Sequence, residues 1–146
     1  MSASIFERVA EEVKVALLNH VAGVDDRVFR AREDAIGIDE GDTLNVFTDG
    51  NQQRTFSDTV DDNELTIAVA IYVRGDVWET KVDVYAVLLH PLVMRHSYSA
   101  AGLKIARVRL TDQDWVAEGG DATPGKRVMR YAFRFLTLAD DITAQP

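Results

Sequence analysis

Histidine is the side chain through which this chain would most readily bind a metal ion or transfer a proton. The sequence contains His20, His90 and His96. Their spacing does not match a helical zinc site, which needs two histidines four residues apart around a glutamate. We therefore interpret the three histidines as ordinary surface or helix-end residues, and the sequence predicts no metal site.

Aspartate and glutamate gather in four short clusters. They fall at residues 25–26, 39–42, 61–64 and 112–114. None has the twelve-residue pattern of a calcium loop, so solvated loops and turn caps explain them better. Paired carboxylates acting as general acid and base would need different environments in one cleft, which the spacing does not indicate.

Motifs for nucleophilic or phosphate chemistry are missing. The chain has no cysteine, which excludes disulfides, thiolate zinc sites and cysteine nucleophiles. It has no Gly-x-Ser-x-Gly elbow, and Gly125-Lys126-Arg127 lacks the rest of a phosphate-binding loop. The tripeptide Arg74-Gly75-Asp76 spells an adhesion motif, but a strand end followed by a helix cap explains it better. The sequence predicts a protein that is not an enzyme, without catalytic, cofactor-binding or metal-binding residues.

Arginines are the remaining side chains with a suggestive arrangement. Arg107 and Arg109 share one face of a predicted strand, and Arg130 and Arg134 share one face of the next. If the apolar residues between them point at the helices, all four arginines emerge together on the other face of the sheet. A solvated strand face is one interpretation of this basic stripe.

The second interpretation is a subunit interface. In a closed ring, each copy presents different patches to its two neighbours, so a basic and an acidic patch of one molecule can complement each other. The first predicted helix carries Glu7 and Glu11 on its polar side, and these are the expected partners of the arginine stripe.

The elements that position these residues follow from hydrophobic periodicity. Ser4 and Glu7 have capping-box spacing, and apolar residues then recur at helical intervals, which predicts an amphipathic helix over 5–20. The β-prone runs 28–32 and 43–47 predict two short strands. The polar segment 49–63 is expected to be a long, poorly ordered loop, because it offers little apolar surface to bury.

The second half of the chain contains helix and strand signals of the same kinds. Strict alternation over 65–73 predicts a long central strand. Capping-box spacing at Asp76 and Glu79 favours a helix over 77–90 that ends before Pro91, although alternating valines leave a strand as the competing interpretation. The runs 104–116 and 127–138 flank a turn-rich cluster and predict an antiparallel hairpin.

Together these elements predict an α+β fold, in which two helices pack on one face of a largely antiparallel or mixed sheet, in the order α-β-β-β-α-β-β. The length of 146 residues suits a single domain spanning 1–146, and the tail 139–146 is expected to be mobile. The predicted core comprises Leu17, Leu65, Ile67, Val69, Ile71, Leu89, Tyr131 and Phe133.

Composition and charge limit the possible partners. The net charge of −8 would repel a polyanion at long range, which argues against dispersed nucleic-acid binding, although a local basic patch remains compatible with it. No apolar run approaches the roughly 20 residues that span a bilayer. A membrane-inserted protein is therefore not expected.

The order of these segments resembles the tail terminator and minor tail proteins of long-tailed phages. The likeness lies in residues 27–32 ahead of Ala35-Ile36, in 44–47, in the long strand that runs into 73–76, and in the closing aromatic strand 130–135. It covers nearly the whole chain, through strand patterns rather than catalytic signatures.

The resemblance implies a small α+β subunit without cofactor. It would form a hexameric ring on the last ring of the tail tube, stop tube growth, and present a surface to the head–tail connector. Its place would be the head-proximal end of the virion tail, after assembly in the bacterial cytoplasm. Three alternatives stay open: another neck or head-completion protein, a small enzyme with an unrecognised site, and a monomeric module that captures a peptide at a sheet edge.

Overall fold

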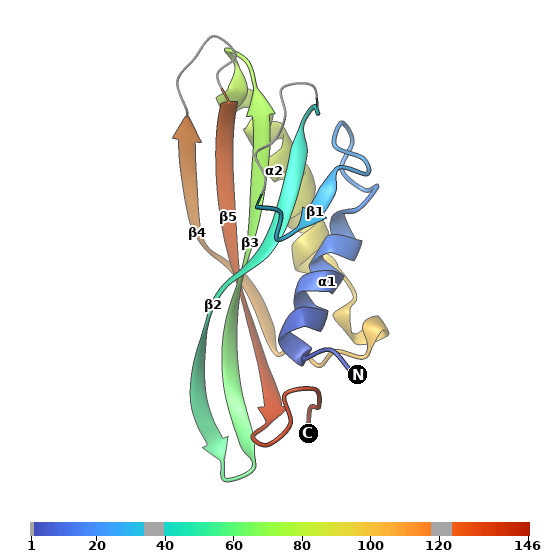
Figure 1. Ribbon diagram of the computed structural model, residues 1–146, viewed down its shortest axis with the longest axis vertical. Helices are drawn as coiled ribbons and strands as arrows, with labels where there is room; N and C mark the ends of the chain where they lie inside the picture. Colours follow the sequence, from blue (N-terminus) through green and yellow to red (C-terminus); the bar gives the residue numbers. More distant parts are fainter. Residues whose placement is uncertain (1, 34–39, 118–123) are drawn as a thin grey trace.

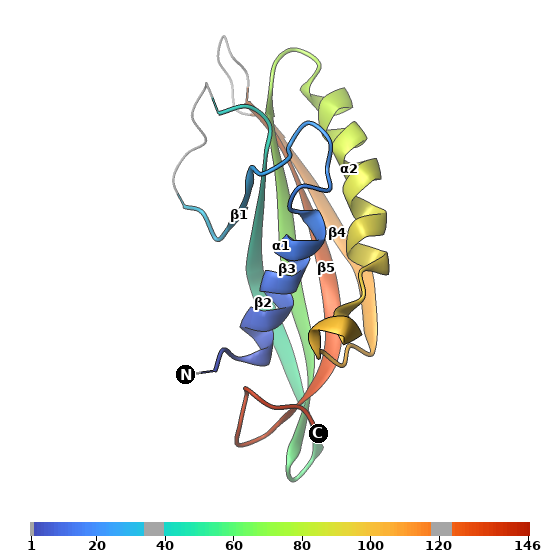
Figure 2. The ribbon, with the colours of Figure 1, turned by 90° about the vertical axis from the view of Figure 1, so that its right-hand side faces the viewer.

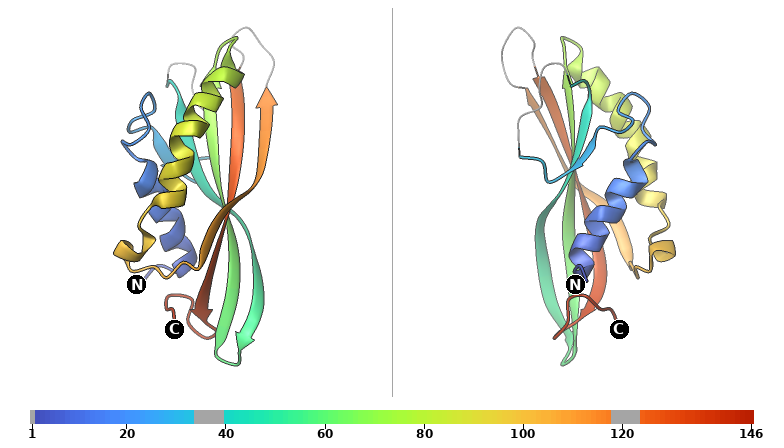
Figure 3. Two further views of the ribbon diagram at one scale, coloured as in Figure 1. Left: turned by 180° about the vertical axis from the view of Figure 1, so that it is seen from behind. Right: turned by 45° about the vertical axis from the view of Figure 1, so that its right-hand side comes forward.

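The fold consists of two α-helices on one face of a twisted five-stranded sheet with strand order β1-β2-β3-β5-β4 (Figures 1 and 3). The computed structural model describes residues 2–33, 40–117 and 124–146. The short β1 pairs in parallel with β2, and all other neighbours are antiparallel. The predicted α+β class and element order are therefore confirmed.

The first helix, α1, spans Ile5–Leu17 and begins as predicted. The Ser4 hydroxyl caps it by accepting a hydrogen bond from the Glu7 amide at 3.2 Å. Its apolar side is buried against the sheet. The helix ends earlier than predicted, because Leu18 leaves helical geometry and Asn19 adopts a left-handed φ of 61°.

The second helix, α2, spans Trp78–Arg95, so the competing strand interpretation of this segment is wrong. Two further expectations also fail. Val77 occupies the cap position and makes no side-chain cap bond, and the helix continues through Pro91. A proline removes the bond to the carbonyl four residues earlier. That carbonyl belongs to Val87, which is 66% exposed, so water can satisfy it. A short 3-10 helix, η1 (Tyr98–Ala101), follows.

The strands are β1 Val28–Arg30, β2 Thr43–Ser57, β3 Val60–Arg74, β4 Arg107–Ala117 and β5 Pro124–Leu138. β2, β3 and β5 are longer than the sequence indicated, whereas β1 and β4 are shorter than the predicted runs 28–32 and 104–116. The predicted hairpin is the β4–β5 pair, and part of its turn-rich cluster lies outside the described residues. All eight predicted core residues are buried, each with at most 3% exposure.

The expected loop at 49–63 is instead a β-hairpin, the β2–β3 arm, which extends beyond the helices (Figures 1 and 2). Its polar side chains form hydrogen bonds with each other across the two strands: Gln53 donates to Asp61 at 3.0 Å, and Asn51 donates to Asn63 at 3.3 Å. β5 adds a third strand along β3, where buried Asn63 donates to Thr137 at 2.9 Å. Cross-strand pairing thus replaces the apolar burial that the segment lacks.

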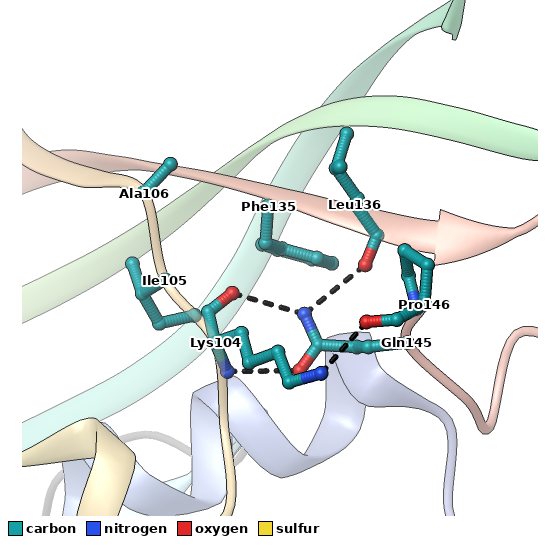
Figure 4. Close-up of a pocket in the computed structure, with 7 residues that line it drawn as sticks. All are labelled: Lys104, Ile105, Ala106, Phe135, Leu136, Gln145 and Pro146. Atoms are coloured by element: carbon teal, nitrogen blue, oxygen red, sulfur yellow. Dashed lines mark hydrogen bonds between the residues drawn. The ribbon is translucent and has the colours of Figure 1, made fainter. Parts of the chain in front are cut away.

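The tail 139–146, expected to be mobile, also packs on the body. The Ile142 carbonyl accepts a hydrogen bond from the Ile5 amide at 2.8 Å, at the start of α1. Gln145 holds the chain before β4 by accepting from the Lys104 amide and donating to its carbonyl, both at 2.9 Å (Figure 4). The tail therefore closes one side of a small pocket floored by Phe135.

Candidate functional site

The four arginines singled out in the sequence lie on the sheet face opposite the helices. Val108 and Leu110 pair with Phe133 and Tyr131, whose side chains are buried on the helix side. The intervening arginines therefore emerge on the other face, which we call the open face. A bulge between Leu110 and Asp112 then turns Asp112 and Asp114 to the open face as well.

Arg130 is the most heavily paired of the four arginines. Its guanidinium bonds to Asp49 at 2.8 Å, to Asp112 at 3.1 Å, and to Asp114. These hydrogen bonds, first to Asp49 and then to Asp114, raise the pKa of Arg130 further above its usual range. A glutamate in place of Arg130 would put four carboxylates together, so its charge reversal would disturb the fold as well as any interface.

Arg134 and Arg109 pair with acidic residues of β3. Arg134 binds both oxygens of Asp62, at 2.7 and 3.2 Å. That hydrogen bonding lowers the pKa of Asp62 below its usual range. Arg109 makes a longer contact with Glu64, at 3.4 Å. Three of the four arginines of the stripe therefore already pair with carboxylates of their own chain.

The proposed acidic partners are engaged within the chain too. Arg30 of β1 contacts Glu7 at 2.8 Å and Glu11 at 3.2 Å, which fastens α1 to the edge of the sheet. The two glutamates remain about half exposed. A contact between them and a neighbour's arginines would have to compete with Arg30.

Two of the three histidines make specific contacts inside the fold. His90 Nδ1 lies 2.9 Å from the Tyr131 hydroxyl, and the two rings stack. Burial raises the pKa of Tyr131 above its usual range. His96 Nε2 lies 2.7 Å from Glu12 and links the end of α2 to α1. Within the described parts of the chain, no three His, Asp or Glu residues gather as a metal site would require.

The sheet leaves two long edges open, whereas the sequence indicated a sheet edge only in one alternative and did not identify the strands that form it. β1 pairs with β2 only from Leu44 to Val46, so the rest of β2 along the arm has no outer neighbour among the described strands. β4 forms the opposite edge. Because residues 49–63 were interpreted as a loop, the open edge along β2 was not predicted.

Each open edge carries an exposed aromatic side chain. Phe56, near the end of β2, is 65% exposed, and Trp115 of β4 is 50% exposed. The Arg127 guanidinium lies 4.6 Å from the Trp115 ring centre, as in a cation–π contact. Exposed aromatic residues are typical of surfaces that bind other proteins.

No protein family model matches the chain, and no curated protein matches it significantly. Among the helices of the described residues, none combines the length and apolar character needed to cross a bilayer.

Proposed function

We propose that this protein is a structural subunit that joins copies of itself into a ring. As the sequence resemblance suggests, the ring would cap the tail tube of a long-tailed phage, end tube growth and form the joint to the head. The observation that supports this proposal best is the pair of unpaired edges on opposite sides of one sheet.

Open strand edges favour association because their backbone amides and carbonyls lack partners within the sheet. The free part of β2 and the whole of β4 are both long enough to add several ladder bonds to a neighbouring strand. Their exposed aromatic residues, Phe56 and Trp115, would add apolar contact at each junction.

Two different edges on one molecule make a head-to-tail contact, in which β2 of one copy meets β4 of the next. Such heterologous contacts form rings when the rotation between copies closes. The resemblance implies six copies. The charged side chains of β4 then fix its register against β2 more than they add affinity.

The ring would meet the tail tube protein on one side and the head–tail connector on the other. The β2–β3 arm extends beyond the helical layer and is suited to contact one of these partners (Figure 2). The subunit would act at the head-proximal end of the virion tail and would need no cofactor.

Cysteine cross-linking tests the edge contact, and the chain contains no native cysteine to interfere. A variant with Gln52→Cys on β2 is mixed with variants carrying one cysteine at successive positions 109–116 of β4. Gln52 lies on the open face, because it pairs with Glu64, which pairs with Arg134. The bulge after Leu110 shifts the alternation of β4, so disulfide-linked dimers are expected at the open-face positions 109, 112, 114 and 116 that come within reach and not at 110, 113 or 115, as measured by non-reducing electrophoresis.

The matched control is Val87→Cys, on an exposed site of α2 away from both edges. It should not cross-link with Gln52→Cys beyond the background of random collisions. Uniform or absent cross-linking along β4 would reject the β2–β4 junction.

The same open edges favour a second candidate, a monomeric module that captures an extended peptide. The two candidates differ in solution mass. A module remains a monomer at every concentration, whereas the ring subunit forms multiples of the 16.2 kDa chain.

A further inference from the structure

The open face contains a hollow of about 210 Å³ where arginines from three strands converge. Three carboxylates surround Arg130. The arginines of this hollow instead leave positive charge facing the solvent. The hollow is lined by Arg54, Glu64, Arg107, Arg109, Ala132 and Arg134.

Strand register explains how the hollow forms. Arg107 of β4 lies directly opposite Arg134 of β5, and Arg134 lies opposite Glu64 of β3. In the next row, Arg109 faces Ala132, whose small side chain leaves space between the longer ones. Arg54 enters from β2, which completes a cationic rim around a floor at Ala132.

The charges of this hollow do not balance. Four guanidinium groups face two carboxylates, those of Asp62 and Glu64, which leaves an excess of two positive charges. Within the described chain, no carboxylate lies at ion-pair distance from Arg54 or Arg107, although Arg54 is close enough to Asp62 to help lower its pKa. The other two arginines remain about half exposed, with donors available.

The cross-strand pair of Arg107 and Arg134 is unfavourable by itself, because like charges directly opposite in a sheet repel each other. An anion between them would turn this repulsion into attraction. Guanidinium groups suit phosphate oxygens in particular, because their parallel N–H donors bind two oxygens at once.

We propose that the hollow formed by Arg54, Arg107, Arg109 and Arg134 is a binding site for a phosphate group. Arg54 and Arg107 supply the donors that no carboxylate occupies. Asp62 and Glu64 hold Arg134 and Arg109 in place. The phosphate belongs either to a small free molecule or to the backbone of a nucleic acid, and both present the same oxygens to the site.

Calorimetric titration of the full chain at low salt tests this site with two probes, inorganic pyrophosphate and a short single-stranded oligonucleotide. Saturable binding of pyrophosphate is expected, at least tenfold weaker for the double variant Arg54→Gln/Arg107→Gln. Glu64→Gln should tighten binding severalfold, because it removes a negative charge from the lining. An oligonucleotide that binds tenfold tighter than pyrophosphate assigns the site to a nucleic-acid backbone, and one that binds no tighter assigns it to a free phosphate compound.

The control double variant, Lys14→Gln/Arg95→Gln, removes the same net charge from the ends of the two helices. It should bind both probes like the unmodified chain, and circular dichroism should show all variants folded. Absence of saturable binding by either probe, or equal weakening in the control, would overturn the proposal. The test does not depend on ring formation, since it reports on the subunit in any state of assembly.

Discussion

Replacing Phe133 by alanine is expected to lower the free energy of unfolding by about 3–5 kcal/mol, the usual cost of truncating a buried aromatic residue. Phe133 is fully buried, and its ring meets Tyr98 edge-on at 5.4 Å between centroids. Its neighbours across the sheet, Leu65 and Val108, are anchored in strands and can close the cavity only in part. Denaturant titration followed by circular dichroism measures this loss.

The matched control is Phe56→Ala, which makes the same chemical change at a side chain that is 65% exposed. It should alter the unfolding free energy by less than about 0.5 kcal/mol, as surface substitutions usually do. Similar losses at Phe133 and Phe56 would contradict the assignment of the core to the helix side of the sheet.

Gly125→Ala is expected to destabilise the fold by about 1–3 kcal/mol, as overpacking a close contact usually does. A Cβ at residue 125 would lie far inside van der Waals contact of the Trp78 indole. Trp78 begins α2, so the helix end or the indole must move. The unfolding free energy of the variant, measured in denaturant, reports this cost.

A double-mutant cycle separates this clash from any effect on the backbone. In the Trp78→Ala background the ring is gone, so Gly125→Ala should cost almost nothing, and the two substitutions should not be additive. An equal cost in both backgrounds would mean that the glycine is required for another reason.

Periodicity predicted those parts of the fold in which one apolar face decides the structure. Leu65, Ile67, Val69 and Ile71 alternate strictly, and they form the buried side of β3. The aromatic residues of β5 follow the same rule. The arginines could be placed on the opposite face because side chains alternate along any strand.

The failures occurred where long-range contacts stabilise the chain. The outer half of β2 is polar on both faces, so no alternation marked it, and only its pairing with β3 makes it a strand. The tail is held by backbone contacts with Ile5 and Lys104, which lie far away in the sequence. Pro91 is accommodated because the carbonyl that it leaves unpaired, that of Val87, lies on the solvent side of α2. The local sequence does not indicate which side of the helix that is.

Only part of the candidate site could be predicted, because its charge pairs also depend on the long-range pairing of strands. Alternation placed the arginines together, but it gave no register, and register decides which of them meet a carboxylate. The bulge after Leu110 brings Asp112 and Asp114 to Arg130. Arg107 instead lies beside Arg134, and Arg54, in the segment interpreted as a loop, was not considered.

Electron microscopy of the purified protein mixed with phage tail tubes tests ring formation and tube capping together. The proposal predicts closed rings of one size seated at a single end of each tube, and tubes so capped should not elongate when more tube protein is added. Tubes that keep growing at both ends, with the protein monomeric in solution, would contradict it.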